Sequence, residues 1–382
     1  MNDHTLLPQV NIPANMIHLG LGQPTNSLLP LNDIKNAAAH ALSVNNPFFL
    51  AYGKEQGNIN FRETLAQFLT GQYAYTVGPD QLLITNGNSQ ALDFICTHFT
   101  HPGDTVFVEE PSYFLALKIF VDRKLNIVGI PMDGYGLDID ALKKFLNSKK
   151  PTFVYTIPAY HNPASVTLSL QRREELVRIC SENNILLVAD EVYHCLSYTE
   201  KPPPSMGYWA DQCLLISLGS FSKILAPGLR LGWMQANSKL IQKLSKAGIL
   251  ESGGGFNPFT SEIVNSVIRS GILTTHINRL KDVYRQRIEV FVEQSTKSFP
   301  EQVVFQYPSG GYFIWVELPD YIDTKFLRQA AKTDNVDFLP GSFFSSKNRL
   351  KNYIRLSFAF YPKEILREGI KRLGNILLKH LS

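Results

Sequence analysis

Between residues 82 and 235, short apolar runs alternate with segments of helical periodicity. Runs such as Ile185–Ala189 are apolar on both faces, which is typical of strands in a parallel sheet that helices cover on both sides. The alternation predicts an α/β fold with a large, mostly parallel sheet and helices on both of its faces. The predicted strands are Leu82–Thr85, Thr105–Glu109, Ile127–Ile130, Phe153–Ile157, Ile185–Ala189, Leu214–Leu218 and Leu231–Gln235, and the predicted helices between them are Ala91–Phe99, Tyr113–Arg123, Asp138–Asn147 and Gln171–Asn183.

The pattern changes near residue 277. Apolar residues then recur at spacings of three and four, which places one apolar stripe along a long helix. Two strands and a closing amphipathic helix follow, which predicts a second, smaller α+β domain. The stripe consists of Ile277, Leu280, Tyr284, Ile288 and Phe291, and the later elements are Tyr312–Val316, Tyr353–Phe358 and Pro362–Leu381.

We therefore predict a large domain over residues 46–280 and a small domain formed by residues 1–45 and 281–382. The N-terminal part is rich in Pro, Gly and Asn and contains one predicted helix, Leu31–Leu42. One continuous large sheet is the alternative, and the long helix disfavours it.

Composition and charge exclude several classes of protein. The 382 residues are 44% apolar and 18% charged, which is ordinary for a globular protein and unlike a disordered chain. A formal net charge of +4 gives no electrostatic reason to expect a nucleic-acid or membrane-surface partner. No stretch has the ~20 consecutive apolar residues of a membrane helix, and the first residues do not resemble a secretory signal. We expect a cytoplasmic protein.

Neither the cysteines nor the histidines have the spacing of a metal site. The pair His98 and His101 is more typical of a helix end, so we predict no metal. The cysteines are expected to be buried thiols; they are Cys96, Cys180, Cys195 and Cys213.

Polar residues follow several predicted strands directly. In a parallel α/β sheet, ligands bind beyond the carboxyl ends of the strands. Each such residue alone is typical of a cap or a turn, but together at one sheet edge they indicate a binding site. They are Asn88 and Ser89 after the first strand, Asn162 after the fourth, Asp190 and Tyr193 after the fifth, and Ser220, Ser222 and Lys223 after the sixth.

This set matches the chemical needs of pyridoxal 5′-phosphate. The N–H groups at the helix start near Asn88 and Ser89, the hydroxyls of Ser220 and Ser222, and Arg230 can bind a phosphate. Asp190 can keep the pyridine nitrogen protonated. Tyr193 and Asn162 can donate to the phenolate oxygen, and Lys223 can condense with the aldehyde.

The run Ser220–Trp233, SFSKILAPGLRLGW, resembles the lysine signature of fold-type-I, class I and II aminotransferases. The nearest branch includes 2-aminoadipate and kynurenine aminotransferases and the effector domains of MocR-type regulators. Other segments resemble the family in the same order along nearly the whole chain. They are Gly20–Pro24 with Gly22 on the substrate side, Leu50–Gly53 with Tyr52, Glu110–Tyr113 with Tyr113 stacked on the pyridine, Asn162-Pro163 with Asn162 also near the substrate, Asp190–Tyr193, and Tyr353–Phe358 with Arg355.

Two motifs depart from the usual family pattern. Many relatives have Asn-Pro-Thr-Gly where this chain has Asn162-Pro-Ala-Ser165, and the phosphate motif is Gly87-Asn-Ser-Gln90 in place of Gly-Ser-Gln-Gln. The donor Asn162 is present, so the first change need not abolish activity. No helix-turn-helix region is found before the predicted domain.

The resemblance implies a ping-pong transamination in a homodimer. Lys223 would act as nucleophile and base, Asp190 would support the ring, and Arg355 would hold the substrate carboxylate. Tyr52 would reach the phosphate in the other subunit's site. A lyase or synthase of the same fold, or a sensor that binds the cofactor without turnover, are the alternatives.

The segment between Gly20 and Gly53 bears on substrate choice. It contains no arginine and only one lysine, Lys35. We therefore predict aromatic to aliphatic amino donors, with 2-oxoglutarate as acceptor by resemblance and 2-aminoadipate as the alternative donor. The apolar residues on which this prediction rests are Leu21, Leu28, Leu29, Phe48, Phe49 and Tyr52.

Overall fold

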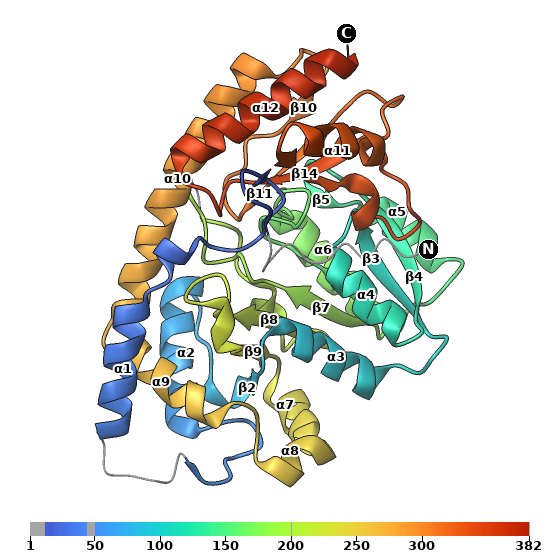
Figure 1. The fold of residues 1–382 in the computed structure, drawn as a ribbon. Coiled ribbons are helices and arrows are strands. Elements are labelled where there is room, and N and C mark those ends of the chain that lie inside the picture. Colours follow the sequence, from blue (N-terminus) through green and yellow to red (C-terminus); the bar gives the residue numbers. More distant parts are fainter. Residues whose placement is uncertain (1–11, 44–49, 200, 382) are drawn as a thin grey trace.

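The computed structural model describes residues 12–43, 50–199 and 201–381. Its centre is an eight-stranded sheet in the order β2-β9-β8-β7-β6-β3-β4-β5 (Figure 1). The strands from β8 to β4 run parallel to one another. The bounds are β2 (Leu82–Thr85), β3 (Thr105–Glu110), β4 (Asn126–Asp133), β5 (Gly136–Leu137), β6 (Phe153–Thr156), β7 (Leu186–Asp190), β8 (Leu215–Ser220) and β9 (Gly232–Gln235).

Helices cover both faces of this sheet, as the doubly apolar strands predict. Successive side chains of a strand point to opposite faces. In β3, Val106 and Val108 accordingly pack in one apolar cluster with α3, α4 and α7, whereas Phe107 packs in another with α5 and α6. The α/β prediction is confirmed, and the helices are α3 (Asn88–Phe99), α4 (Phe114–Asp122), α5 (Ile139–Leu146), α6 (Leu170–Glu182) and α7 (Ser238–Ser245).

Strand β9 is antiparallel to both of its neighbours, β2 and β8. A parallel strand needs a crossover connection of roughly a dozen or more residues, usually a helix. The chain instead returns from β8 to β9 through residues 221–231, which contain only the short 3-10 turn Pro227–Leu229. This connection carries Lys223 and Arg230 beyond the end of the sheet.

The small domain is built on the antiparallel sheet β10-β11-β14-β13. The long helix α10 (Ile272–Ser298) packs along α12 (Lys363–Leu381), as Figure 1 shows. A second, smaller domain is thus confirmed, while its boundaries at residues 46 and 280 stay a prediction. The remaining elements of this part are β1 (Ile17–His18), β10 (Val304–Phe305), β11 (Phe313–Glu317), α11 (Thr324–Thr333), β12 (Val336–Asp337), β13 (Leu339–Pro340) and β14 (Tyr353–Ser357).

Several helices were not predicted. These include α2 (Ile59–Tyr73), α8 (Gly248–Gly253) and α9 (Pro258–Arg269). Helix α9 packs against α2 and also against α1 (Leu31–Ser43), which was predicted. None of the helices described is long and apolar enough to cross a membrane. The four cysteines are buried and free, as expected.

Candidate active site

A cavity of about 620 Å³ lies at the carboxyl ends of the central parallel strands. The start of α3, the β8–β9 connection, the N-terminal segment near Gly22 and strand β14 of the small domain also contribute to its wall. All but one of the predicted site residues line it: Gly22, Asn88, Ser89, Tyr113, Asn162, Asp190, Tyr193, Ser220, Ser222, Lys223, Arg230 and Arg355. Concave sites that join a few polar groups to an apolar wall are typical of small-molecule binding.

Tyr52 is the exception. Its residue surface is 88% exposed, and it does not line the cavity of its own chain. Its predicted role in the partner's site therefore depends on a dimer.

Asp190 ends β7 and is buried. Its Oδ1 accepts a hydrogen bond of 2.7 Å from Asn88 Nδ2, and its Oδ2 accepts one of 2.9 Å from the hydroxyl of Tyr155. Burial raises the pKa of Asp190, although these two donors oppose the shift. The two donors that contact the carboxylate are neutral, so the carboxylate is suited to pair with a cationic ring nitrogen.

Two points of the sequence prediction change here. The Asn88 side chain is engaged with Asp190, so a phosphate contact from Asn88 would use its backbone N–H at the start of α3. Tyr155 was missed, because a tyrosine in the apolar strand Phe153–Thr156 reads as core. The available signal was its hydroxyl, because a tyrosine hydroxyl in a buried strand usually needs a hydrogen-bond partner.

The part of the cavity wall at the start of α3 and the β8–β9 connection is rich in hydrogen-bond donors. Gly87 has a φ of 81° and precedes α3, whose first N–H groups lack helical partners. A Cβ at Gly87 would lie 3.2 Å from Arg230 Nη2, so glycine allows the guanidinium to approach the start of this helix. The hydroxyls of Ser220 and Ser222 lie 3.0 Å apart. Together these groups fit a phosphate.

Lys223 points its Nζ at the carbonyl oxygen of Gly22, to which it donates over 2.8 Å. Burial lowers the pKa of Lys223 to about 8, and the positive charges of Arg355 and Arg230 add to this effect. Asp190 opposes it. A lysine whose neutral form is accessible near neutral pH is suited to act as nucleophile and base.

Arg355 is buried on β14, with only 3% of its surface exposed. Nη1 donates to Asn162 Oδ1 and Nη2 to the Gly20 carbonyl, each over 2.8 Å, and Nε is buried without a hydrogen bond. The guanidinium carbon lies 4.0 Å from the ring centroid of Phe313. Because Asn162 accepts through Oδ1, its Nδ2 group is oriented away from Arg355, and its donation to a cofactor oxygen stays a prediction.

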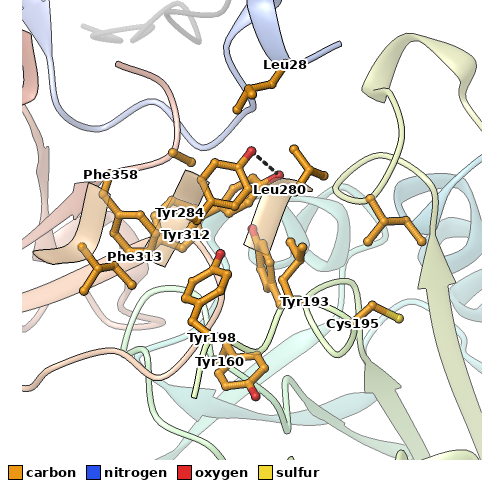
Figure 2. Close-up of a cluster of buried hydrophobic side chains, with 14 of the residues drawn as sticks. Leu28, Tyr160, Tyr193, Cys195, Tyr198, Leu280, Tyr284, Tyr312, Phe313 and Phe358 are labelled. Atoms are coloured by element: carbon orange, nitrogen blue, oxygen red, sulfur yellow. Dashed lines mark hydrogen bonds between the residues drawn. The ribbon is translucent and has the colours of Figure 1, made fainter. Parts of the chain in front are cut away.

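A cluster of buried aromatic residues joins the large and small domains (Figure 2). The hydroxyl of Tyr312 donates to the Lys223 backbone carbonyl over 2.9 Å, and Tyr284 of α10 donates to Tyr312 over 3.3 Å. The ring of Tyr193 lies 5.3 Å from that of Tyr312. The backbone at Lys223 and the ring of Tyr193 are thus held by residues of the small domain and the long helix.

Comparison with known proteins decides the family. The family Aminotransferase class I and II matches residues 14–373. The chain belongs to the class I and II aminotransferases. It is therefore a pyridoxal-phosphate-dependent aminotransferase in fold and in enzyme class, as the lysine signature predicted.

Three relatives place this aminotransferase more closely. Aromatic-amino-acid aminotransferase 1 of Thermococcus litoralis is 33% identical over 376 residues, covering 97% of this chain and 89% of the relative. The 2-aminoadipate transaminase of Thermus thermophilus is 31% identical over 361 residues, covering 93% and 88%. The kynurenine aminotransferase of Pyrococcus horikoshii, solved with PMP and KYN, superimposes with a TM-score of 0.91 at 33% identity, covering 97% and 92%.

More distant relatives include HTH-type transcriptional regulators at 27% identity, in agreement with the predicted MocR relationship. The chain therefore lies in the aromatic, multiple-substrate and 2-aminoadipate subgroup. In the part of the aminotransferase that the structure describes, no group of three or more His, Cys, Asp or Glu side chains could hold a metal ion.

The pKa of Lys223 gives a testable prediction. In cofactor-free protein, labelling of Lys223 by acetic anhydride should rise with pH through about 8, because only the neutral amine reacts and the ordinary pKa is 10.5. Mass spectrometry of the Lys223 peptide measures the extent of labelling. The same protein in urea is the control, and its midpoint should move up toward the ordinary value. An equal midpoint in the folded and unfolded chains would contradict this.

Proposed function

We propose that this aminotransferase moves the amino group of large neutral L-amino acids to a 2-oxo acid such as 2-oxoglutarate, with pyridoxal 5′-phosphate as cofactor. The observation that carries the proposal is Arg355. Its guanidinium is buried, its hydrogen-bond acceptors are neutral oxygens, and no carboxylate of the described chain pairs with it. Because an unpaired buried charge is costly, this arrangement favours a substrate that brings a carboxylate.

The residues of the cavity fit the proposed cofactor. The N-terminus of α3, Ser220, Ser222 and Arg230 would hold its phosphate, and Asp190 would pair with its ring nitrogen. Tyr113 lies at the start of α4 on the cavity wall, where its ring is available to stack on the pyridine. When bound, pyridoxal phosphate supplies an aldehyde that receives the amino group and a protonated ring that withdraws electrons.

Lys223 and Arg355 would then have different roles toward the substrate. The guanidinium of Arg355 would bind the α-carboxylate and so orient the substrate. Lys223 Nζ would take the proton from the substrate Cα and later return one. Tyr193 and Asn162 Nδ2 would donate hydrogen bonds to the phenolate oxygen of the cofactor.

The cavity wall supports a neutral substrate side chain. Its cations are Lys223, Arg230 and Arg355, and each has a role in this proposal. The rest of the lining is largely apolar, so a second carboxylate on the substrate would find no further described cation. The apolar lining residues include Leu21, Phe114, Leu115, Val192, Phe313 and Leu339.

Most of the apolar residues on which the substrate prediction rested do not line the cavity of their own chain. Of the predicted set, only Leu21 lines the cavity. Leu28 is buried in the same apolar core as Leu280 (Figure 2), and Leu29 and Tyr52 do not line the cavity of their own chain. Phe48 and Phe49 fall outside the described residues. The apolar character of the pocket therefore comes from segments far along the chain, such as Phe114, Phe313 and Leu339.

A panel of amino donors tests the function. Holoenzyme is mixed with phenylalanine, leucine, methionine or 2-aminoadipate without an oxo acid, and pyridoxamine phosphate is measured by chromatography. We expect conversion with the three neutral donors, and no conversion by Lys223→Ala, which lacks the base and should lose at least about 100-fold in rate.

Three outcomes would contradict the proposal. Conversion by 2-aminoadipate alone would show that the similarity to the 2-aminoadipate transaminase extends to its substrate. Release of ammonia, 2-oxobutyrate and methanethiol from methionine without an acceptor would indicate a lyase. No turnover with any donor would favour a sensor.

We also propose a homodimer in which Tyr52 completes the partner's site. Large apolar side chains are exposed on α1, α8, α9, the first residue of α2 and the segment around Tyr52, and these elements lie toward one end of the molecule (Figure 1). Clustered exposed apolar residues are typical of a protein interface. They are Leu31, Leu42, Leu50, Tyr52, Ile59, Ile249 and Phe259.

Mixing two impaired variants tests the shared site. Tyr52→Phe should weaken the phosphate site by about 10-fold or more, since a hydrogen bond to a charged group is lost. When Tyr52→Phe and Lys223→Ala chains are refolded together, heterodimers should regain activity at one intact site. Tyr321→Phe, which changes another exposed tyrosine (72%), is the matched control and should stay active alone. A fully active monomer in sedimentation would contradict the proposal.

A further inference from the structure

A buried chain of three ionisable side chains leads from the small domain toward the site. Arg328 of α11 donates two hydrogen bonds to the carboxylate of Asp337 on β12, of 2.5 and 2.9 Å. Asp337 Oδ2, which also accepts from Arg328 Nη2, lies 3.3 Å from His18 Nε2, a buried nitrogen that has no hydrogen-bond partner among the described residues. The three side chains are between 5% and 11% exposed. None of them lines the cavity, and the proposed chemistry does not use them.

His18 connects Asp337 to the backbone of Gly20. The backbone N–H of Gly20 donates to His18 Nδ1 over 3.0 Å, so that nitrogen carries no proton. The proton of the neutral ring is then on Nε2, which faces Asp337. Burial lowers the pKa of His18 to about 4, although Asp337 opposes the shift, so the ring is neutral at physiological pH.

Gly20 is in turn the direct support of Arg355, because its carbonyl oxygen accepts from Arg355 Nη2 over 2.8 Å. The backbone on either side is fastened to the small domain. Leu19 N–H donates to the Asp337 carbonyl over 2.7 Å, and Leu19 accepts from Ser357 of β14. A Cβ at Gly20 would lie 2.8 Å from His18 Cε1, so the imidazole packs directly on this glycine.

We propose that His18, oriented by Asp337 and Arg328, is a positioning residue that fixes the Gly20 carbonyl against Arg355 and so aims the guanidinium at the substrate carboxylate. The inference rests on the proposed function, in which Arg355 binds that carboxylate. Arg355 has two neutral supports, Asn162 from the large domain and Gly20 from the N-terminal segment. Loss of the second would let the guanidinium turn away from the substrate, and small misplacements of a positioning group are costly.

The geometry separates positioning from general stability. His18→Leu removes the acceptor for Gly20 and the contact with Asp337, whereas His18→Asn keeps an acceptor oxygen near the place of Nδ1. Asp337→Asn keeps the backbone pairing of β12 with β1 and removes the charge that orients the ring. His276→Leu is the matched control, because His276 is another buried histidine (5% exposed) and lies outside the cavity wall.

The experiment measures how tightly the holoenzyme binds 3-phenylpropionate, a carboxylate without an amino group, by calorimetry, and the KM and kcat for phenylalanine. We expect His18→Leu to raise both the Kd and the KM by about 10-fold, with kcat changed less than about threefold. Asp337→Asn should do the same to a smaller extent, and His18→Asn should restore most of the affinity. His276→Leu should leave the Kd unchanged.

A melting temperature for each variant shows whether it folds. If His18→Leu does not fold, the other two variants test the inference. A Kd for 3-phenylpropionate that is raised in Asp337→Asn and close to the wild-type value in His18→Asn supports it. A wild-type enzyme that transaminates and binds 3-phenylpropionate, with folded variants that bind it equally well, overturns this inference alone. A wild-type enzyme that does neither overturns the proposed function and the inference together.

Discussion

The positive charge of Arg355 is held in the interior of the protein, and the site is arranged around it. Burial lowers the pKa of Arg355 to about 10, yet the group remains a cation at neutral pH. Its surroundings supply an amide oxygen, a backbone carbonyl and the faces of aromatic rings in place of a carboxylate. Neutral groups of this kind compensate the loss of water around the Arg355 charge only in part. The site therefore favours a ligand that supplies a carboxylate.

The same constraint joins the two domains. Arg355 comes from a strand of the small domain, whereas Asn162, Asp190 and Lys223 come from the ends of strands in the large domain. The aromatic cluster around Tyr312 and the buried chain from Arg328 to Gly20 fix these parts relative to one another. The polar chemistry therefore rests on a packed interface that crosses the boundary between the domains.

Much of this arrangement could be predicted from the sequence, because it follows from local rules. Apolar runs that end in Asp190 or Ser220 place those residues at the carboxyl edge of a sheet. The residues that were missed depend on tertiary contacts. Tyr155 reads as core until its hydroxyl is seen to contact Asp190, and the sequence predicts Asn88 at a helix start without showing that its amide also donates to Asp190. His18 and Asp337 are more than three hundred residues apart along the chain, and only the pairing of β1 with β12 brings them together.

Removing the substrate carboxylate tests the central role of Arg355 most directly. The half-reaction rate of the holoenzyme with phenylalanine is compared with that for 2-phenylethylamine, which has the same ring and amine and no carboxylate. We expect a strong preference for phenylalanine in the wild type, and a preference reduced by about 100-fold in Arg355→Gln, since a buried charge pair is lost. An equal preference in both proteins would show that Arg355 does not bind the substrate carboxylate.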